Sequence, residues 1–254
     1  MTDSIAPKPT SAALTKIGIT PGSYDLIPLD GLRQTIANRM TESFRDVPHF
    51  PLTIDVEIDA LLRFRSRYNE EKAEGSGLKV TLNDVIVRAC AVALARVPEA
   101  NASFTPDGIA RHHHADIAVA VALDNGLITP ILRSVDTKSL IQVSIESKDL
   151  IARARAMKLS PRDYKGGTFS ISNLGMFGIR QFASILNQPH GCILSVGVGE
   201  QRPIVKEGQI GIATVMSLTL TCDHRVVDGA VGARLLQTLQ ALLETPCIAD
   251  YDLA

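Results

Sequence analysis

The sequence predicts an α/β domain in which a mixed sheet is covered by helices. Three observations favour this fold class. Short alternating or continuous apolar stretches lie between longer stretches with helical spacing. Hairpin turns and longer crossover connections both occur, so antiparallel and parallel neighbours are expected in one sheet. The 254 residues are 45% hydrophobic and 21% charged, which is a globular composition.

The N-terminal residues 1–24 differ from the remainder of the chain. They are rich in Ala, Pro, Ser and Thr and have no sustained period, which is typical of a flexible arm or a linker remnant. We expect one folded domain over residues 25–254, and the chain contains no internal repeat.

The first half of this domain predicts three helices and a strand. Residues 29–44 have helical spacing, with Asp30 in the capping position and one apolar face made of Leu32, Ile36, Met40 and Phe44. Residues 49–59 alternate as a half-buried strand does, with Phe50, Leu52, Ile54, Val56 and Ile58 on one side. Asp59 is expected to cap a helix over residues 60–74. Thr81 and Asp84 resemble a capping box that opens a helix ending before Pro98.

The second half predicts strands and two long helices. Residues 115–123 and 127–132 are expected to be strands joined by the turn Asp124-Asn125-Gly126. A helix should run from Ser139 to about Lys158, followed by a strand over residues 166–173 and a buried strand over 191–199. A hairpin is expected over residues 201–223, turning at Glu207-Gly208. The last helix covers 229–244, with Asp228 at its N-cap.

Charge and composition exclude several classes of protein. The net charge is −1, from 26 basic and 27 acidic residues, and no basic stripe interleaved with aromatics occurs, so nucleic acid is not an expected partner. No apolar run is long enough to span a bilayer, and the N-terminus lacks the order of a signal peptide. The cysteines are far apart without a CxxC pair, which predicts buried reduced thiols in a cytosolic protein: Cys90, Cys192, Cys222 and Cys247.

Residues 222–230, "CDHRVVDGA", contain a candidate base. His224 follows a predicted strand and precedes a predicted helix, and loops carried by rigid elements are common places for catalytic groups. Histidine suits proton transfer near neutral pH. A loop histidine without a catalytic role explains the spacing equally well, and a helix cap alone explains Asp228.

Residues 166–179, "GGTFSISNLGMFGI", contain a candidate oxyanion donor. Ser172 lies at the end of a strand that is entered through two glycines, where backbone can approach another group closely. Its hydroxyl can donate to a developing oxyanion. Serine and asparagine at strand ends also bond their own backbone in turns, which is the alternative.

Two further motifs have simpler explanations. His112 and His114 in "RHHHAD" lie on one side of any strand, as metal ligands can, but a solvated turn is favoured and no metal is expected. "GVGEQR" is too short to be a nucleotide-binding loop, and no helix pattern follows it.

Together, these stretches resemble the acyltransferase component of 2-oxo acid dehydrogenase complexes. "DHRVVDG", "GGTFSISNLGMFGI", "LDGLRQTIANRMTESF", "NASFT" and "ADIAVAVALDNGLITPIL" occur in that family's order, over roughly residues 25–245. The resemblance implies a chloramphenicol-acetyltransferase-like fold and a homotrimer whose active site lies between subunits, with larger cores built from trimers. "SNLGMFGI" with "DHRVVDGA" is most similar to the pyruvate branch of the family.

The resemblance also implies a reaction and its residues. His224 would be the general base that activates the thiol of coenzyme A, and Ser172 would donate to the oxyanion when acetyl is transferred to or from dihydrolipoamide. Asp228 would orient the loop, pairing with Arg33 or, as second choice, Arg39. The lipoyl group would come from a lipoyl domain not present in this chain. The other implied partners are the decarboxylase and dihydrolipoamide dehydrogenase components.

Alternatives to an acetyltransferase stay open. The same fold can serve as a non-catalytic core protein, although such members usually lose the histidine, or can transfer branched-chain or succinyl groups. The C-terminal "ETPCIADYDLA" is longer and more polar than the apolar tail that joins trimers in many members, so assembly beyond the trimer is open. The expected location is the bacterial cytoplasm, or the mitochondrial matrix in a eukaryote.

Overall fold

The computed structural model describes residues 11–71, 78–123 and 126–252. The predicted turn residues Asp124 and Asn125, the end of the helix predicted over 60–74, and residues 1–10 of the predicted arm lie outside the described residues. The chain divides into two compact units, residues 1–38 and 39–254. The predicted boundary after residue 24 stays a prediction.

The first unit contains a short helix and the beginning of a longer one. These are α1 (Ala12–Lys16) and α2 (Gly31–Asp46). The predicted cap of α2 is confirmed, because Asp30 Oδ1 accepts the backbone N–H of Arg33 at 2.7 Å. α2 continues into the second unit, where Phe44 is 68% exposed. The C-terminal end of its predicted apolar face is therefore not buried within this chain.

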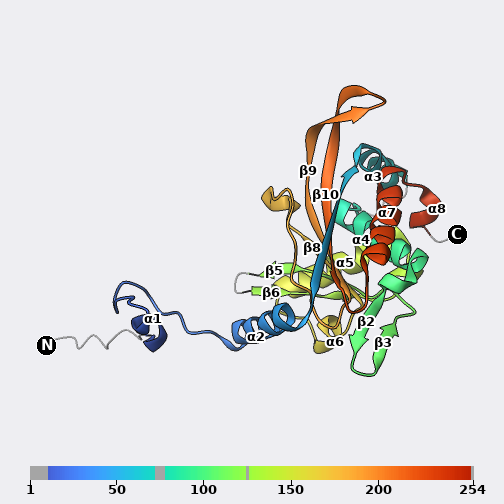
Figure 1. The fold of residues 1–254 in the computed structure, drawn as a ribbon. Coiled ribbons are helices and arrows are strands. Elements are labelled where there is room, and N and C mark those ends of the chain that lie inside the picture. Colours follow the sequence, from blue (N-terminus) through green and yellow to red (C-terminus); the bar gives the residue numbers. More distant parts are fainter. Residues whose placement is uncertain (1–10, 72–77, 124–125, 253–254) are drawn as a thin grey trace. The chain divides into compact units, whose positions relative to one another are not determined.

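The second unit is built on a six-stranded mixed sheet, which confirms the predicted fold class (Figure 1). The strands in spatial order are β1 (His49–Glu57), β10 (Gln209–Asp223), β9 (Cys192–Lys206), β8 (Phe169–Asn173), β4 (Ile117–Val119) and β7 (Ile131–Leu132). β8 pairs in parallel with β9 and β4, and the other pairs are antiparallel. Two separate hairpins are β2 (Ala102–Thr105) with β3 (Gly108–Arg111), and β5 (Val121–Leu123) with β6 (Gly126–Ile128).

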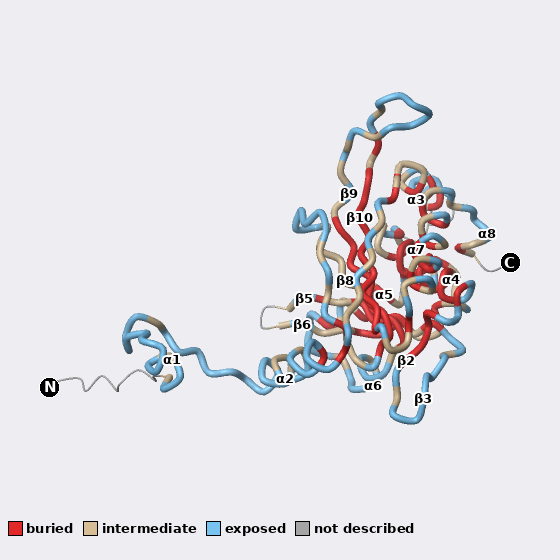
Figure 2. The backbone as a smooth tube through the Cα atoms, in the orientation of Figure 1, coloured by how far each residue is buried: buried red, intermediate tan, exposed pale blue. Residues whose placement is uncertain are grey.

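Helices connect and follow these strands in the second unit. They are α3 (Asp59–Glu71), α4 (Leu82–Arg96), α5 (Leu140–Arg155), α6 (Pro161–Tyr164), α7 (Gly229–Glu244) and α8 (Ile248–Tyr251), with single 3-10 turns at Pro98–Ala100, Val135–Thr137 and Gly175–Phe177. Figure 2 shows the buried residues concentrated in the central strands and in α4 and α7. Within the described residues, no helix is both long and apolar enough to cross a bilayer.

Several predicted elements are confirmed because their signals are local. Capping boxes open α4 at Thr81 with Asp84 and α5 at Ser139 with Gln142. β1 alternates in burial as predicted. The β9–β10 hairpin turns at Glu207 and Gly208, whose φ values of 52° and 77° match a turn that needs two positive φ angles.

Other predictions were wrong. Each strand predicted over 115–123 and 127–132 is interrupted, and Pro130, which has no N–H for a ladder, separates β6 from β7. Asp59 is the first residue of α3 and not its cap, and its carboxylate accepts the Thr214 N–H at 2.8 Å and hydroxyl at 2.7 Å. Cys247 is exposed, whereas the other three cysteines are buried. The β2–β3 hairpin was not predicted.

Candidate active site

His224 begins the loop that joins β10 to α7. Its backbone N–H donates to Pro48 O at 3.0 Å, and its ring packs edge-on against Phe50 with centroids 4.8 Å apart. The residue is exposed. Within the described residues its imidazole makes no hydrogen bond, so both ring nitrogens are available to a substrate. The structure thus places this candidate base on a rigid support with its ring accessible.

The residues on either side of His224 form an ion pair. Arg225 Nη2 lies 2.7 Å from Asp223 Oδ2, and its Nε donates to Asp223 Oδ1 at 2.9 Å. The hydrogen bonds that the Arg225 guanidinium donates to the Asp223 carboxylate raise the pKa of Arg225. Arg225 also lies over the Phe104 ring, 4.0 Å from its centroid. Arg225 belongs to "DHRVVDG" and Phe104 to "NASFT", but no role for either residue was predicted from the sequence.

Asp228 caps α7, as predicted. Its Oδ1 accepts the backbone N–H of Val231 at 2.8 Å, and its φ and ψ of −78° and 174° are those of an N-cap. Arg33 belongs to the other unit, and its pairing with Asp228 stays a prediction. The second choice, Arg39, donates to Gln188 O at 3.0 Å.

Ser172 lies on β8, in register with polar residues of the neighbouring strands. It pairs with Ser195 of β9, which pairs with Thr219 of β10. Thr219 in turn pairs with Thr53 of β1, and their hydroxyls are 2.9 Å apart. Cross-strand partners share a face, so these four hydroxyls form a row on one face of the sheet. Ser172 lies at one end of this row and is half-buried.

One chain does not bring Ser172 and His224 together. His224 lies five residues beyond Thr219, which is about 16 Å along the strand direction, and two strand spacings add about 10 Å across the sheet. The two Cα atoms are therefore roughly 19 Å apart. A single substrate carbonyl cannot contact both side chains of one chain.

A second histidine forms a serine–histidine pair that the sequence did not indicate. Ser170 Oγ lies 2.7 Å from His190 Nδ1, and His190 Nε2 lies 2.9 Å from Gly166 O. His190 is 2% exposed, and burial lowers its pKa to about 4. Both ring nitrogens have protein partners and no substrate can reach them, so the pair secures the turn that enters β8.

The two histidines of "RHHHAD" that share one side of a strand, His112 and His114, have different partners. His112 Nε2 lies 2.8 Å from Ser103 Oγ, and burial lowers its pKa. His114 Nδ1 lies 3.0 Å from Asp136 Oδ2, which raises the pKa of His114 through that hydrogen bond. Each imidazole thus has a separate structural contact.

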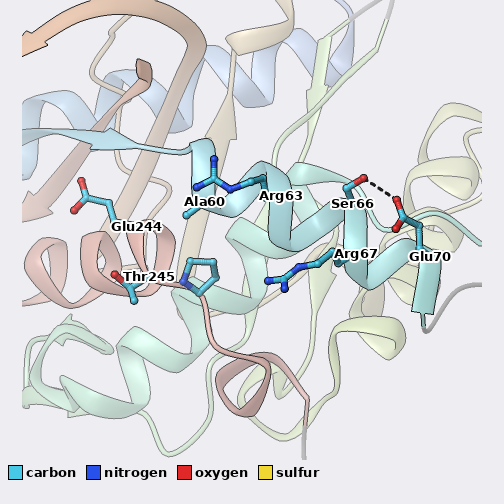
Figure 3. A pocket seen from close by; sticks show the side chains of 8 residues that line it. Ala60, Arg63, Ser66, Arg67, Glu70, Glu244 and Thr245 are labelled. Atoms are coloured by element: carbon cyan, nitrogen blue, oxygen red, sulfur yellow. Dashed lines mark hydrogen bonds between the residues drawn. The ribbon is translucent and has the colours of Figure 1, made fainter. Parts of the chain in front are cut away.

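A pocket of about 580 Å³ lies between α3 and the end of α7, and Figure 3 shows the side chains that line it. Its lining includes Arg63 and Arg67 on α3 and Glu244 and Thr245 at the end of α7. Neither His224 nor Ser172 lines it. A smaller cavity of about 150 Å³ borders Asn173, the residue next to Ser172.

Comparison with solved structures relates this fold to acyltransferase cores. Dihydrolipoamide acetyltransferase of Azotobacter vinelandii has a TM-score of 0.85 and 33% identity, over 95% of this chain and 98% of that chain. The cubic core of a pyruvate dehydrogenase multienzyme complex has a TM-score of 0.85 and 32% identity, over 95% and 98%. A chloramphenicol acetyltransferase has a TM-score of 0.53 at 18% identity, over 80% and 94%, which confirms the predicted fold alone.

Sequence comparison agrees. The acetyltransferase component of the Rhizobium meliloti pyruvate dehydrogenase complex is 47% identical over 89% of this chain and 51% of its own length. The chain spans about half the length of this curated relative, and 59% of a Rickettsia bellii relative of the same description. The family model of the 2-oxoacid dehydrogenases acyltransferase catalytic domain matches residues 21–248. The chain therefore belongs to the 2-oxoacid dehydrogenase acyltransferase family, whose catalytic domain it contains.

Proposed function

We propose that this protein transfers an acetyl group between dihydrolipoamide and coenzyme A, as a dihydrolipoyllysine-residue acetyltransferase of a pyruvate dehydrogenase complex. One observation carries the proposal. The Azotobacter vinelandii enzyme was investigated for the catalytic role of a serine, a histidine 52 positions later and an asparagine four positions after that. Ser172, His224 and Asp228 have the same spacing. The third residue differs, but both aspartate and asparagine cap helices well.

His224 acts as the general base in this proposal. Its accessible imidazole takes the proton of the coenzyme A thiol, and the thiolate attacks the thioester carbonyl of acetyl-dihydrolipoamide. Ser172 donates its hydroxyl hydrogen bond to the tetrahedral oxyanion. When the intermediate collapses, the imidazolium returns the proton to the leaving dihydrolipoyl sulfur. A positioned base supplies about 10² to 10⁴ in rate, and an oxyanion donor supplies roughly 3 to 4 kcal/mol.

Two copies of the chain would build each active site. The separation of roughly 19 Å derived from strand geometry is too long for one carbonyl to contact both residues. A cyclic homotrimer would solve this, because its heterologous interfaces join different surfaces of neighbouring copies and would bring one copy's His224 beside another copy's Ser172. Met176 and Phe177, in the 3-10 turn Gly175–Phe177, lie just beyond the strand of Ser172 and are 79% and 64% exposed, as expected at such an interface.

The wider assembly follows from the relatives. The similarity to a cubic core supports an oligomeric core for this chain. Its partners would be lipoyl domains that present the dihydrolipoyl group, with the decarboxylase and dihydrolipoamide dehydrogenase components of the complex. Related proteins occur in bacteria and in mitochondria, and we propose a bacterial cytoplasmic or a mitochondrial matrix location accordingly.

A non-catalytic core protein is the alternative from a different class. The exposed His224 weighs against it, since a scaffold has no use for an accessible imidazole beside an aromatic support. Succinyl or branched-chain transfer would keep the same mechanism and change only the pocket for the acyl group.

A steady-state assay tests the proposal. Free dihydrolipoamide is combined with acetyl-, succinyl- or isobutyryl-coenzyme A, with the His224→Ala variant as the control. Acetyl-coenzyme A is expected to have the highest kcat/KM. Turnover equal to that of the His224→Ala control with every donor would favour the scaffold, and a preference for another donor would overturn the acetyl assignment.

A further inference from the structure

We propose that Arg225 is a positioning residue for His224. The Arg225 clamp, defined as Arg225 with Asp223 and Phe104, would fix the loop so that the imidazole meets the reacting thiol. This inference rests on the proposed function, because it assigns a role within the same reaction. In this role Arg225 acts through His224.

Asp223 is the fixed end of the clamp. It is the last residue of β10, and its side chain is only 6% exposed. Its backbone N–H donates to Gly191 O at 2.8 Å, and its carbonyl accepts the N–H groups of Val226 and Val227, each at 2.9 Å. Its carboxylate accepts the backbone N–H and the guanidinium of Arg225. Without Arg225 the negative charge of this buried carboxylate would have no opposite charge beside it, so the ion pair holds Arg225 in its place.

Phe104 is the second contact, from a different part of the chain. It lies on β2, and the guanidinium carbon of Arg225 is 4.0 Å from its ring centroid. The start of β2 also packs closely against Gly191, since a Cβ added there would lie 2.3 Å from Ala102 O. Gly191 is in turn bonded to Asp223 at the end of β10. The contacts therefore form a closed ring: β10 end, Gly191, β2 and Arg225. A closed ring of contacts resists displacement better than a single ion pair does.

His224 depends on this ring because its side chain has few restraints of its own. Its backbone N–H donates to Pro48 O, and its ring meets Phe50, but within the described residues the imidazole has no hydrogen-bonding partner. Its place is therefore determined by the backbone on either side. Asp223 and Arg225 are those two neighbours. The charged groups around the loop are Asp223, Arg225 and Asp228, with Asp46 at the end of α2, whose carbonyl lies 3.5 Å from Arg225 Nη1.

Steady-state kinetics of four variants tests the proposal, with both substrates varied. Arg225→Met should lower kcat by about tenfold or more with little change in either KM, because a displaced base affects only the chemical step. Arg225→Lys keeps the positive charge but not the two-nitrogen contact of the guanidinium with Asp223, so its kcat should lie between those of Arg225→Met and the unmodified protein. Phe104→Leu should cost about two- to fivefold in kcat, and Phe104→Tyr should be close to unmodified.

The matched control is Arg153→Met. Arg153 also forms ion pairs, with Asp149 and Asp163 at 2.8 Å each, but it lies on α5. It should leave kcat unchanged. All assays are run well below each variant's unfolding temperature, so that lost stability does not lower kcat. Unchanged kcat in Arg225→Met, or a rise in KM alone, would overturn the positioning role.

Failure of the proposed function is distinguishable from failure of the clamp. If the unmodified protein shows no turnover, the proposed function is wrong and the clamp is judged by crystal structures of the unmodified and Arg225→Met proteins. A displaced or disordered His224 ring in the variant supports the clamp. A ring in an unchanged place overturns it.

Discussion

The His224 loop and the Ser172 strand hold their candidate catalytic groups in different ways. His224 lies outside the sheet. Its place depends on the contact of its neighbour Arg225 with Phe104, on the ring of Phe50 and on the backbone carbonyl of Pro48. Ser172 lies inside a parallel ladder, in register with Ser195. Strand pairing places the donor, whereas the base is placed by one backbone hydrogen bond and by side-chain contacts with distant segments. Substitutions around the base should therefore matter more than substitutions around the donor.

The largest effect is expected for His224→Ala. Activity should fall by about 10² to 10⁴, because the positioned base is lost. The residue is exposed, so the unfolding temperature should change little. Kinetics and thermal unfolding of the purified variant check this. Activity within a few-fold of the unmodified protein would show that another group is the base.

Ser172→Ala should lower kcat by about 10² with little change in KM, because the oxyanion exists only in the transition state. The strand should stay intact, since β8 is held by its ladder. A change confined to KM would make Ser172 a binding residue.

Asp228→Asn should have a smaller effect, about tenfold in activity, because asparagine keeps the cap of α7 and only a charged hydrogen bond is lost. If that bond joins Asp228 to Arg33, it contributes roughly 1.5 to 3 kcal/mol to stability when sheltered. Arg33→Met should then resemble Asp228→Asn, and the double variant should be little worse than either. If the losses of stability in the two single variants add fully in the double variant, as measured by thermal unfolding, Asp228 and Arg33 do not interact.

Mixing two inactive variants tests whether the two regions meet across copies. Equal amounts of His224→Ala and Ser172→Ala chains, co-expressed so that subunits mix at random, should recover about a quarter of the unmodified activity. This follows because a site would need His224 from one copy and Ser172 from another. Absence of any recovery in mixed oligomers confirmed by mass spectrometry would mean that both residues act within one chain.

The smallest effect is expected for Ser195→Ala, next to Ser172. The Ser195 hydroxyl is bonded to Ser184 Oγ at 2.7 Å and is buried, so its removal should cost about 1 kcal/mol of stability. Activity should stay within about twofold of the unmodified protein, since the backbone ladder and not the hydroxyl row places Ser172. A loss approaching that of Ser172→Ala would show that side chains position the donor too.

The sequence alone determined the features that depend on residues close together in the chain, which are helix caps, strand alternation and turns. Caps at Thr81, Ser139 and Asp228 are visible because the cap side chain and the backbone N–H that donates to it lie three residues apart. The alternation of β1 and the turn at Glu207-Gly208 are likewise local. The mixed sheet follows from the mixture of hairpins and crossovers. His224, Ser172 and Asp228 were selected as candidates because their motifs occur together, and their catalytic roles remain proposals.

Only the tertiary structure decided which distant residues meet. Asp59 bonds Thr214, 155 positions away, instead of capping a helix, and nothing near Asp59 in the chain indicates that partner. Arg225 over Phe104 and the buried Ser170–His190 pair are similar cases. The ladder separates Ser172 from His224 by register, which no spacing along the chain encodes. Local signals arise from backbone geometry within a few residues, whereas these contacts arise only when the sheet aligns strands that are far apart in sequence.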